Sequence, residues 1–285
     1  MAAAKASWLS NLRHHLDARG FDLLYALQLG AYNVQMPPAH RVGASIANDE
    51  ALCLLIGNTR RLWSPFLRWT RDQLASDPSL AAHDRSWNPI DQYSESSVRR
   101  ALSDAGAPGH ELFFVHERAP GRVLSFQRLA AATGAFYLDS GTHLCLHPHA
   151  GPWVAFRALA VFPDLRASEW GAPALGSDAA SMPCPASEGE LALAKSALRE
   201  ALERAERREE GRSWRDWLRV RDAFSLGHAW RYAEAQIEYH YGGDREALAR
   251  VALAEDTDAG KTDAVESVAK GGSGAATKAL ADPSS

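Results

Sequence analysis

The chain has 285 residues, of which 46% are hydrophobic, so it can hold one large domain or two small ones around a sizeable core. Its 31 basic and 35 acidic residues give a formal net charge of −4, which argues against a nucleic-acid partner and against a polybasic membrane anchor. The three cysteines lie far apart, which excludes a CxxC motif and a disulfide framework and favours a reducing compartment.

No segment of the sequence has the pattern of a membrane anchor or a secretion signal. The longest apolar runs fall short of the ~20 residues that a membrane-spanning helix needs. The few alanines before Lys5 are too short for the apolar core of a signal peptide. We therefore expect a soluble, cytoplasmic protein.

The first half of the chain combines helical and strand-like patterns. Trp8, Leu12 and Leu16 recur at a spacing of four, which predicts an amphipathic helix over residues 7–19 that ends at Gly20. The other elements expected in this half are an apolar, aromatic segment at 21–32, a buried strand at 51–56, a helix at 62–74, a helix after the turn at 88–93, and a short strand at 112–116.

The second half begins with strands and becomes helical. The expected elements are a helix at 125–133, paired strands at 135–138 and 143–147, a strand at 153–162, a long irregular loop at 164–188, and a helix at 190–208. Strands that precede a mostly helical C-terminal third favour an α+β layered domain. From about residue 256 the chain lacks aromatics and is rich in small and polar residues. This composition predicts one domain over 1–255 and a disordered tail over 256–285.

Several histidines and a cysteine lie close together in one segment. His143, Cys145, His147 and His149 would share one face if a single strand ran through them, and such side chains are common metal ligands. Neighbours on one strand rarely complete a tetrahedral site, and Pro148 interrupts the strand. We therefore expect a cavity wall with a buried cysteine, with no protein metal site and no cysteine nucleophile. The GxSxG, HExxH, P-loop and GxGxxG motifs are all missing, so no common nucleotide loop holds a cofactor.

Arg157 is the most unusual charged residue because it lies inside an apolar run. An arginine in such a place needs a partner. Two interpretations stay open: an internal carboxylate such as Asp216 or Asp222, or an anionic ligand that the guanidinium grips with two hydrogen bonds. Arg221 and Arg245 are candidates for the same ligand.

A series of short motifs over about residues 10–250 resembles the cobalamin-processing proteins of the cblC type. Each motif is weak alone, but the ordered set is fairly specific. The motifs are Gly20-Phe21, Gln28, Tyr32-Asn33, Pro37-Pro38, Gly134-Ala135 with Tyr137, Cys145-Leu-His-Pro148, Gly151 with Trp153, Arg157, Trp214-Arg-Asp-Trp217, Arg221-Asp-Ala223, Arg231-Tyr232 and Gln236.

The resemblance implies a nitroreductase-like fold of the flavin reductase type, with a central antiparallel or mixed sheet flanked by helices. It implies a large cavity that takes cobalamin base-off, with the nucleotide tail in a side pocket and no protein ligand on the cobalt. The chain agrees in lacking the DxHxxG motif that supplies a histidine ligand. The implied activities are those of a cyanocobalamin reductase that uses reduced FMN or FAD, and of an alkylcobalamin dealkylase that uses glutathione. A ligand-induced homodimer and a cobalamin-delivery partner are compatible with the resemblance.

The resemblance also implies site residues, although no catalytic side chain is assigned. Glutathione would be bound by Arg157, Arg221 and, across an alignment gap, Arg245. The residues expected to contact cobalamin are Gln127, Tyr137, Leu144, Cys145, Leu146, His147, Trp217 and Tyr232. Two positions depart from the family's pattern, since Ala131 replaces a histidine and Pro152 replaces a glycine. These departures bring the thiol-dependent reaction into question.

Two other functions fit the same residues. A nitroreductase-type flavoenzyme acting on small electrophiles would bind flavin tightly and purify as a yellow protein without affinity for corrinoids. A non-catalytic carrier would bind cobalamin base-off and show the spectral shift without turnover.

Overall fold

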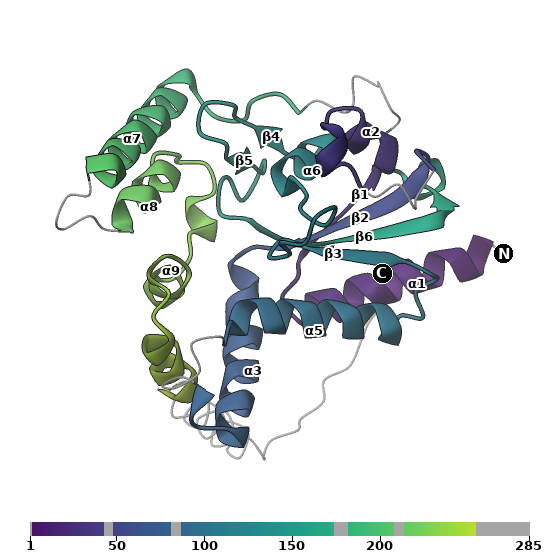
Figure 1. Ribbon diagram of the computed structural model, residues 1–285, viewed down its shortest axis with the longest axis horizontal. Coiled ribbons are helices and arrows are strands. Elements are labelled where there is room, and N and C mark those ends of the chain that lie inside the picture. Colours follow the sequence, from purple (N-terminus) through teal and green to yellow (C-terminus); the bar gives the residue numbers. More distant parts are fainter. Residues whose placement is uncertain (1, 43–47, 81–86, 174–181, 208–213, 255–285) are drawn as a thin grey trace, which may run out of the picture.

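A four-stranded antiparallel sheet forms the centre of the fold (Figure 1). The computed structural model describes residues 2–42, 48–80, 87–173, 182–207 and 214–254, so the tail predicted at 256–285 lies outside the described residues. In spatial order the strands are β1 (Leu23–Gln28), β2 (Ala51–Asn58), β6 (Ala155–Arg166) and β3 (Glu111–Phe114). The expected α+β class with an antiparallel sheet is confirmed.

Strand β2 is the middle of the core, and all eight of its residues are buried. Side chains alternate along a strand, so Leu54 and Ile56 pack on one face while Cys53 and Leu55 pack on the other. Helices cover both faces (Figure 1). One face carries α1 (Ala2–Asp17), α3 (Trp63–Ser76) and α5 (Pro89–Asp104), and the other carries α2 (Leu29–Asn33) and α6 (Phe126–Ala132).

The C-terminal third is helical, as expected, and lies beside a second, small sheet (Figure 1). That sheet pairs β4 (Tyr137–Leu138) with β5 (Cys145–Leu146). Two helices, α7 (Glu188–Arg207) and α8 (Arg215–Asp222), pack on each other next to it. The chain continues through α9 (Glu234–Ile237), a π-helical turn η6 (Glu238–Gly242) and a helix over 245–254. Short 3₁₀ turns are η1 (Pro38–His40), η2 (Arg60–Leu62), η3 (Ala167–Trp170) and η5 (His228–Trp230).

Strand β6 extends further than its pattern predicts and contains two irregularities. Its register against β2 shifts between the pairs of Ile56 and Gly57, where the partners jump from Ala158 to Phe156. The residue left over is Arg157, so this arginine occupies a β-bulge. The second shift spans Pro163, which cannot donate to the ladder. Because the second bulge accommodates the proline, the strand continues to Arg166, and the irregular loop expected from residue 164 was placed too early.

The α7 helix is tied to the segment after α8 by one carboxylate. Glu190 accepts hydrogen bonds of 2.6–2.9 Å from the backbone N–H and hydroxyl groups of Ser225 and Ser187. These bonds, those from Ser225 first, lower the pKa of Glu190 to about 2. Because the pKa of Glu190 is lower in the folded state, its carboxylate stabilises the folded state at pH values above the unfolded pKa of about 4.5. This stabilisation is lost as the pH falls toward 2.

Glu190→Gln is therefore expected to lower the melting temperature at pH 7 and to flatten its decline between pH 5 and about 3. The measurement is thermal unfolding by circular dichroism across this pH range. Glu188→Gln is the matched control because Glu188 lies exposed on the same helix. Equal pH dependence of wild type and Glu190→Gln would contradict the role assigned to this carboxylate.

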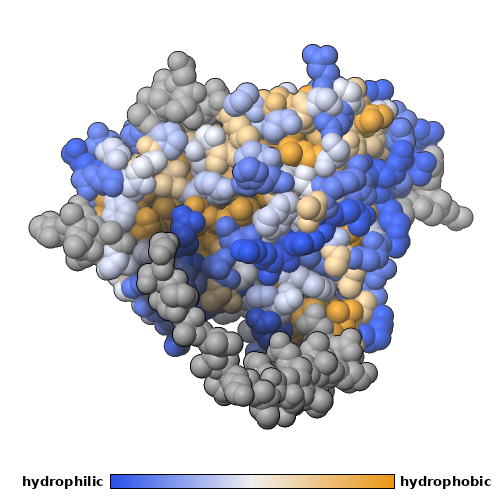
Figure 2. Space-filling view, turned by 180° about the vertical axis from the view of Figure 1, so that it is seen from behind, coloured by the Kyte–Doolittle hydropathy of each residue, from blue (hydrophilic) through white to orange (hydrophobic). Residues whose placement is uncertain are grey.

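Hydrophobic residues reach the surface in several separate places. In Figure 2 the hydrophobic residues, coloured orange, are interrupted by hydrophilic residues and do not form one continuous apolar surface in that view. On α7, for example, Leu193 is 63% exposed and Leu202 is 46% exposed. None of the described helices combines the length and apolarity that crossing a bilayer requires.

Candidate functional site

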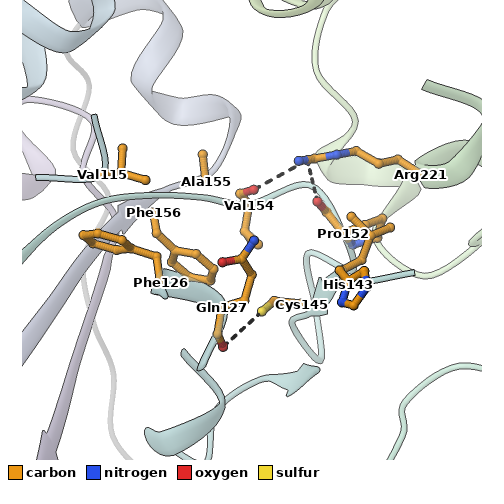
Figure 3. A pocket seen from close by; sticks show the side chains of 11 residues that line it. Val115, Phe126, Gln127, His143, Cys145, Pro152, Val154, Ala155, Phe156 and Arg221 are labelled. Carbon is orange, nitrogen blue, oxygen red and sulfur yellow. Dashed lines mark hydrogen bonds between the residues drawn. The ribbon is translucent and has the colours of Figure 1, made fainter. Parts of the chain in front are cut away.

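A pocket of about 180 Å³ lies between the start of β6, helix α6, strand β5 and helix α8 (Figure 3). Phe126, Val154 and Phe156 supply apolar walls. Four of the residues predicted to bind ligands meet there: Gln127, Leu144, Cys145 and Arg221. The pocket thus joins segments that are far apart in the sequence, and it combines an apolar interior with one cation.

Arg221 reaches from α8 to the turn that precedes β6. Its Nη1 donates to the carbonyl oxygen of Pro152 at 2.6 Å and lies 3.5 Å from that of Val154 (Figure 3). The guanidinium carbon is also 5.9 Å from the centre of the Trp153 ring. Carbonyl dipoles orient a guanidinium but do not neutralise its full charge. The side chain is therefore fixed in place with donors left for an anion.

Arg157 lies close to Arg221 and is held by the bulge in β6. Its Nε donates to Oδ1 of Asn58 at 2.8 Å, across the sheet on β2. The side chain is half-buried, and burial lowers the pKa of its guanidinium, with the charge of Arg221 acting in the same direction. Its hydrogen-bond partner is thus a neutral amide, and among the described residues the carboxylate of Asp91 acts on it without forming an ion pair.

The two internal carboxylates considered as partners of Arg157 are engaged elsewhere. Asp216 lies 3.2 Å from Arg204, and Asp222 lies 2.9 Å from Arg231. Within the described part of the chain, no carboxylate forms an ion pair with Arg157. The structure therefore contradicts the internal pairing with Asp216 or Asp222. The carboxylate that acts on Arg157 from a distance is Asp91, and an anionic ligand stays a prediction.

Buried polar groups without hydrogen-bond partners surround the two arginines. Trp153 Nε1, Tyr232 Oη and His240 Nε2 have no partner among the described residues, and neither does Gln236 Nε2 on α9. The Trp153 and Tyr232 ring centres are 5.5 Å apart, and those of Tyr232 and His240 are 5.6 Å apart. A buried polar group without a partner costs about 1–3 kcal/mol, so several at one place are typical of a site that a ligand completes.

Arg245 lies in a second pocket of about 250 Å³, between the start of α5 and the π-helical turn. Tyr239 and His240 line the same pocket. Both Arg157 and Arg245 act electrostatically on Tyr239, although burial dominates and raises the pKa of that phenol. The three predicted arginines therefore surround one aromatic region without sharing a single pocket.

The other residues predicted to contact cobalamin lie outside the first pocket. Leu146 is fully buried in a cluster with α7 and α8, and Tyr137 packs against that cluster. Trp217 is 37% exposed on α8, whereas Tyr232 is buried against Trp153. Their roles toward cobalamin stay predictions.

His147, which was predicted to contact cobalamin, does not line the pocket. Its Nδ1 accepts from the backbone N–H groups of His149 and Ala150 at 3.2 and 3.1 Å, so Nε2 carries the proton that it donates to the Tyr25 hydroxyl at 2.8 Å. Burial first, and then His149, lower the pKa of His147 to about 4. A neutral imidazole with both nitrogens engaged holds the turn between β5 and β6 in shape.

The histidines and the cysteine do not share one strand face. Strand β5 covers only Cys145–Leu146, and His143 before it has a left-handed φ of 58°. Among the residues that the structure describes, no three His, Cys, Asp or Glu side chains are arranged to hold a metal ion.

The geometry can now be set beside known proteins. No family model matches the chain. A curated protein from Danio rerio, named cyanocobalamin reductase / alkylcobalamin dealkylase, is 29% identical over 260 residues, which is 85% of this chain and 92% of that protein. A solved structure of a C. elegans B12-trafficking protein, CblC, a homologue of human MMACHC, matches with a TM-score of 0.64 at 19% identity, over 87% of this chain and 97% of that one.

The resemblance to the cblC-type proteins is confirmed. Pro152, one of the two predicted departures from the cblC-type pattern, lines the pocket, and its backbone carbonyl accepts the 2.6 Å hydrogen bond from Arg221. Any residue supplies such a carbonyl, so this departure does not remove Arg221 from the pocket. The other departure, Ala131, lies on α6 beside Gln127 and Phe126 of the pocket wall.

Sequence reasoning missed two residues that the cblC-type resemblance does not mark. Asn58, the partner of Arg157, ends the buried run of β2, and a polar residue at the end of such a run was a usable signal. His240 lies in an aromatic segment, and nothing in its sequence neighbourhood indicates that it lies near Arg157 and Arg221.

Cys145 lines the pocket as an unreactive thiol. Burial raises its pKa to about 12, and its Sγ lies 3.5 Å from the carbonyl oxygen of Gln127. At pH 7.5 iodoacetamide is expected to label the exposed Cys184 quickly and to leave Cys145 and the buried Cys53 unlabelled. Peptide mass spectrometry of the native protein measures this. Labelling of Cys145 as fast as Cys184 would contradict the assignment.

Proposed function

We propose that this chain binds cobalamin base-off and removes its upper axial ligand. It would do so by flavin-dependent reductive decyanation of cyanocobalamin and by glutathione-dependent dealkylation of alkylcobalamins. The observation that carries the proposal is the pair of arginines, Arg157 and Arg221, which lie next to an apolar pocket and form no ion pair with a carboxylate among the described residues. The match to the Danio rerio relative covers most of the length of both proteins, and the name of that relative supports the same activity.

The size of the pocket bears on how cobalamin would bind. Sites that enclose a whole drug-sized ligand measure roughly 300–1,000 Å³, and this pocket measures about 180 Å³. It would take only a part of the vitamin, such as the lower base of the nucleotide tail, and the corrin ring would stay outside it. Apolar walls hold the tail away from the cobalt. Without its lower donor, Co(III) accepts electrons more easily, because that donor stabilises the higher oxidation state.

Neither of the two pockets that contain the candidate arginines is large enough to enclose a whole flavin, since both measure less than 300 Å³. Reduced FMN or FAD would supply the electrons for decyanation. The protein would promote decyanation by holding cyanocobalamin in its base-off state.

In dealkylation, the arginines position the thiol reagent. Glutathione carries two carboxylates, which match two guanidiniums with free donors. The thiolate attacks the alkyl carbon, the cobalt–carbon bond breaks, and its electron pair stays on cobalt as Co(I). Holding sulfur and carbon at reacting distance is the contribution of Arg157 and Arg221, because oriented reactants avoid most of the entropic cost of meeting.

The proposal extends to the organisation of the protein. Residues 1–255 form the cobalamin-processing domain, and the antiparallel sheet with helices on both faces is compatible with a nitroreductase-like arrangement. We place the protein in the cytoplasm, with a ligand-induced homodimer and a cobalamin-delivery protein as partners.

Visible spectroscopy of the purified protein with cyanocobalamin, before and after reduced flavin is added, tests this function. Decyanation predicts conversion to reduced cobalamin and release of cyanide, faster than reduced flavin achieves alone. A carrier would bind the vitamin and give no such acceleration. A nitroreductase-type flavoenzyme would purify with flavin and leave the corrinoid spectrum unchanged.

A further inference from the structure

His240 occupies an unusual backbone position. It is the central residue of the π-helical turn Glu238–Gly242, which continues α9. Such turns are rare, and they occur often at functional sites. The turn directs the imidazole toward the Trp63, Tyr232 and Tyr239 rings, with ring centres 5.4–6.2 Å away.

The imidazole has an unused nitrogen next to the cations of the proposed thiol site. Its Nε2 is buried and has no hydrogen-bond partner among the described residues. The ring lines the pocket of about 250 Å³ that also contains Arg245. Burial first, then Arg157 and Arg221, lower the pKa of His240 to about 3, so the ring is neutral at pH 7 while no ligand is bound.

An anionic ligand would change this balance. The charged and titratable groups around the imidazole come from four helices or helical turns, one strand and one loop: Arg157, Arg221, Arg245, Asp91, Tyr232 and Tyr239. Three of them are cations, and the ligand carboxylates would neutralise the arginines they bind. Burial, the largest cause of the lowered pKa, would remain, but the repulsion from the arginines that adds to it would fall, and the affinity of His240 for a proton would rise.

We propose that His240 accepts the proton of the bound thiol in the dealkylation step. This inference rests on the proposed function and adds the group that makes the thiolate. The S–H bond breaks, its proton goes to Nε2, and its electron pair stays on sulfur. The thiolate forms a bond to the alkyl carbon as the cobalt–carbon bond breaks, and cobalt leaves as Co(I). The imidazolium then returns its proton to water.

Kinetics of methylcobalamin loss with glutathione provide the first test. His240→Gln is expected to lower the rate at pH 7 by about 100-fold, the usual size of a general-base contribution. The loss should shrink as the pH rises toward the pKa of the free thiol, because solution then supplies thiolate directly. His110→Gln, at an exposed histidine that packs on Phe162 and lines neither pocket, is the matched control and should behave like wild type.

Two further measurements separate proton transfer from a structural role. Binding of S-methylglutathione, which has no S–H group, should be unchanged in His240→Gln. Saturation of the wild type with S-methylglutathione should raise the pKa of His240 in an NMR titration. If His240→Gln folds poorly, His240→Gly with added imidazole replaces it, and imidazole should restore the rate.

Each outcome decides one point. A wild type that does not dealkylate methylcobalamin rejects the proposed function. An active wild type whose His240→Gln variant keeps the same rate and pH profile rejects the role of His240 alone. A variant that loses rate and S-methylglutathione affinity in equal measure also rejects it, because binding and not proton transfer would then explain the loss.

Discussion

Replacing Arg157 by alanine is expected to raise the glutathione concentration needed for half-maximal loss of methylcobalamin by about 10- to 100-fold. Arg157 is held by the β-bulge and by Asn58, and it has no carboxylate partner among the described residues. A hydrogen-bonded charge pair with a ligand carboxylate contributes about 1.5–3 kcal/mol, which is roughly that change in affinity. Initial rates at limiting and at saturating glutathione measure the effect.

The matched control is Arg166→Ala on the same strand. Arg166 is an exposed arginine paired with Glu50 at 3.4 Å, so its loss is expected to change neither rate nor glutathione dependence. Arg157→Lys should recover only part of the affinity, because an ammonium group cannot make the two-pronged contact. An Arg157→Ala variant with wild-type rates at limiting glutathione would contradict the assignment of this residue.

Gly227→Ala is expected to be among the most damaging small substitutions in the chain. Gly227 has a φ of +81°, and a Cβ there would lie 2.1 Å from the carbonyl oxygen of Ala150. This contact joins the turn before β6 to the segment after α8, and therefore joins the two sides that carry Pro152 and Arg221. We expect a loss of about 3 kcal/mol or more, since left-handed strain and a backbone clash add.

Gly121→Ala separates the two contributions. Gly121 has a similar φ of +75°, but nothing lies within 4 Å of its added Cβ. It should cost about 1–2 kcal/mol through backbone strain alone. Thermal unfolding is expected to show a larger fall for Gly227→Ala, at about 2–4 °C per kcal/mol for a domain of this size. Equal falls for the two variants would show that the close contact at Gly227 is not important for stability.

Much of the fold could be predicted because its core follows simple rules. The run at 51–56 is apolar at every position, and the structure places it in the middle of the sheet with helices on both sides. The paired strands around Asp139 and the helix ended by Gly134 also follow their local patterns. These elements depend on short-range chemistry that the sequence contains.

The details of the site depend on contacts between distant segments. The sequence shows Arg157 as a cation in an apolar run. The bulge that positions it depends on how β6 pairs with Gly57 of β2, and its hydrogen-bond partner Asn58 is 99 positions away in the sequence. The extension of β6 past Pro163 depends on the same pairing partner. The surroundings of His240 combine β6, α8 and the loop before α9, so local periodicity could not reveal them.

The central claim is that an apolar pocket next to fixed guanidiniums holds cobalamin with its nucleotide base off the metal. Titrating methylcobalamin with the purified protein and recording the visible spectrum tests it most directly. The account predicts that the absorption moves to that of the base-off form and stops changing when the protein is in excess. Absorption that stays that of the base-coordinated vitamin at saturating protein would contradict the account.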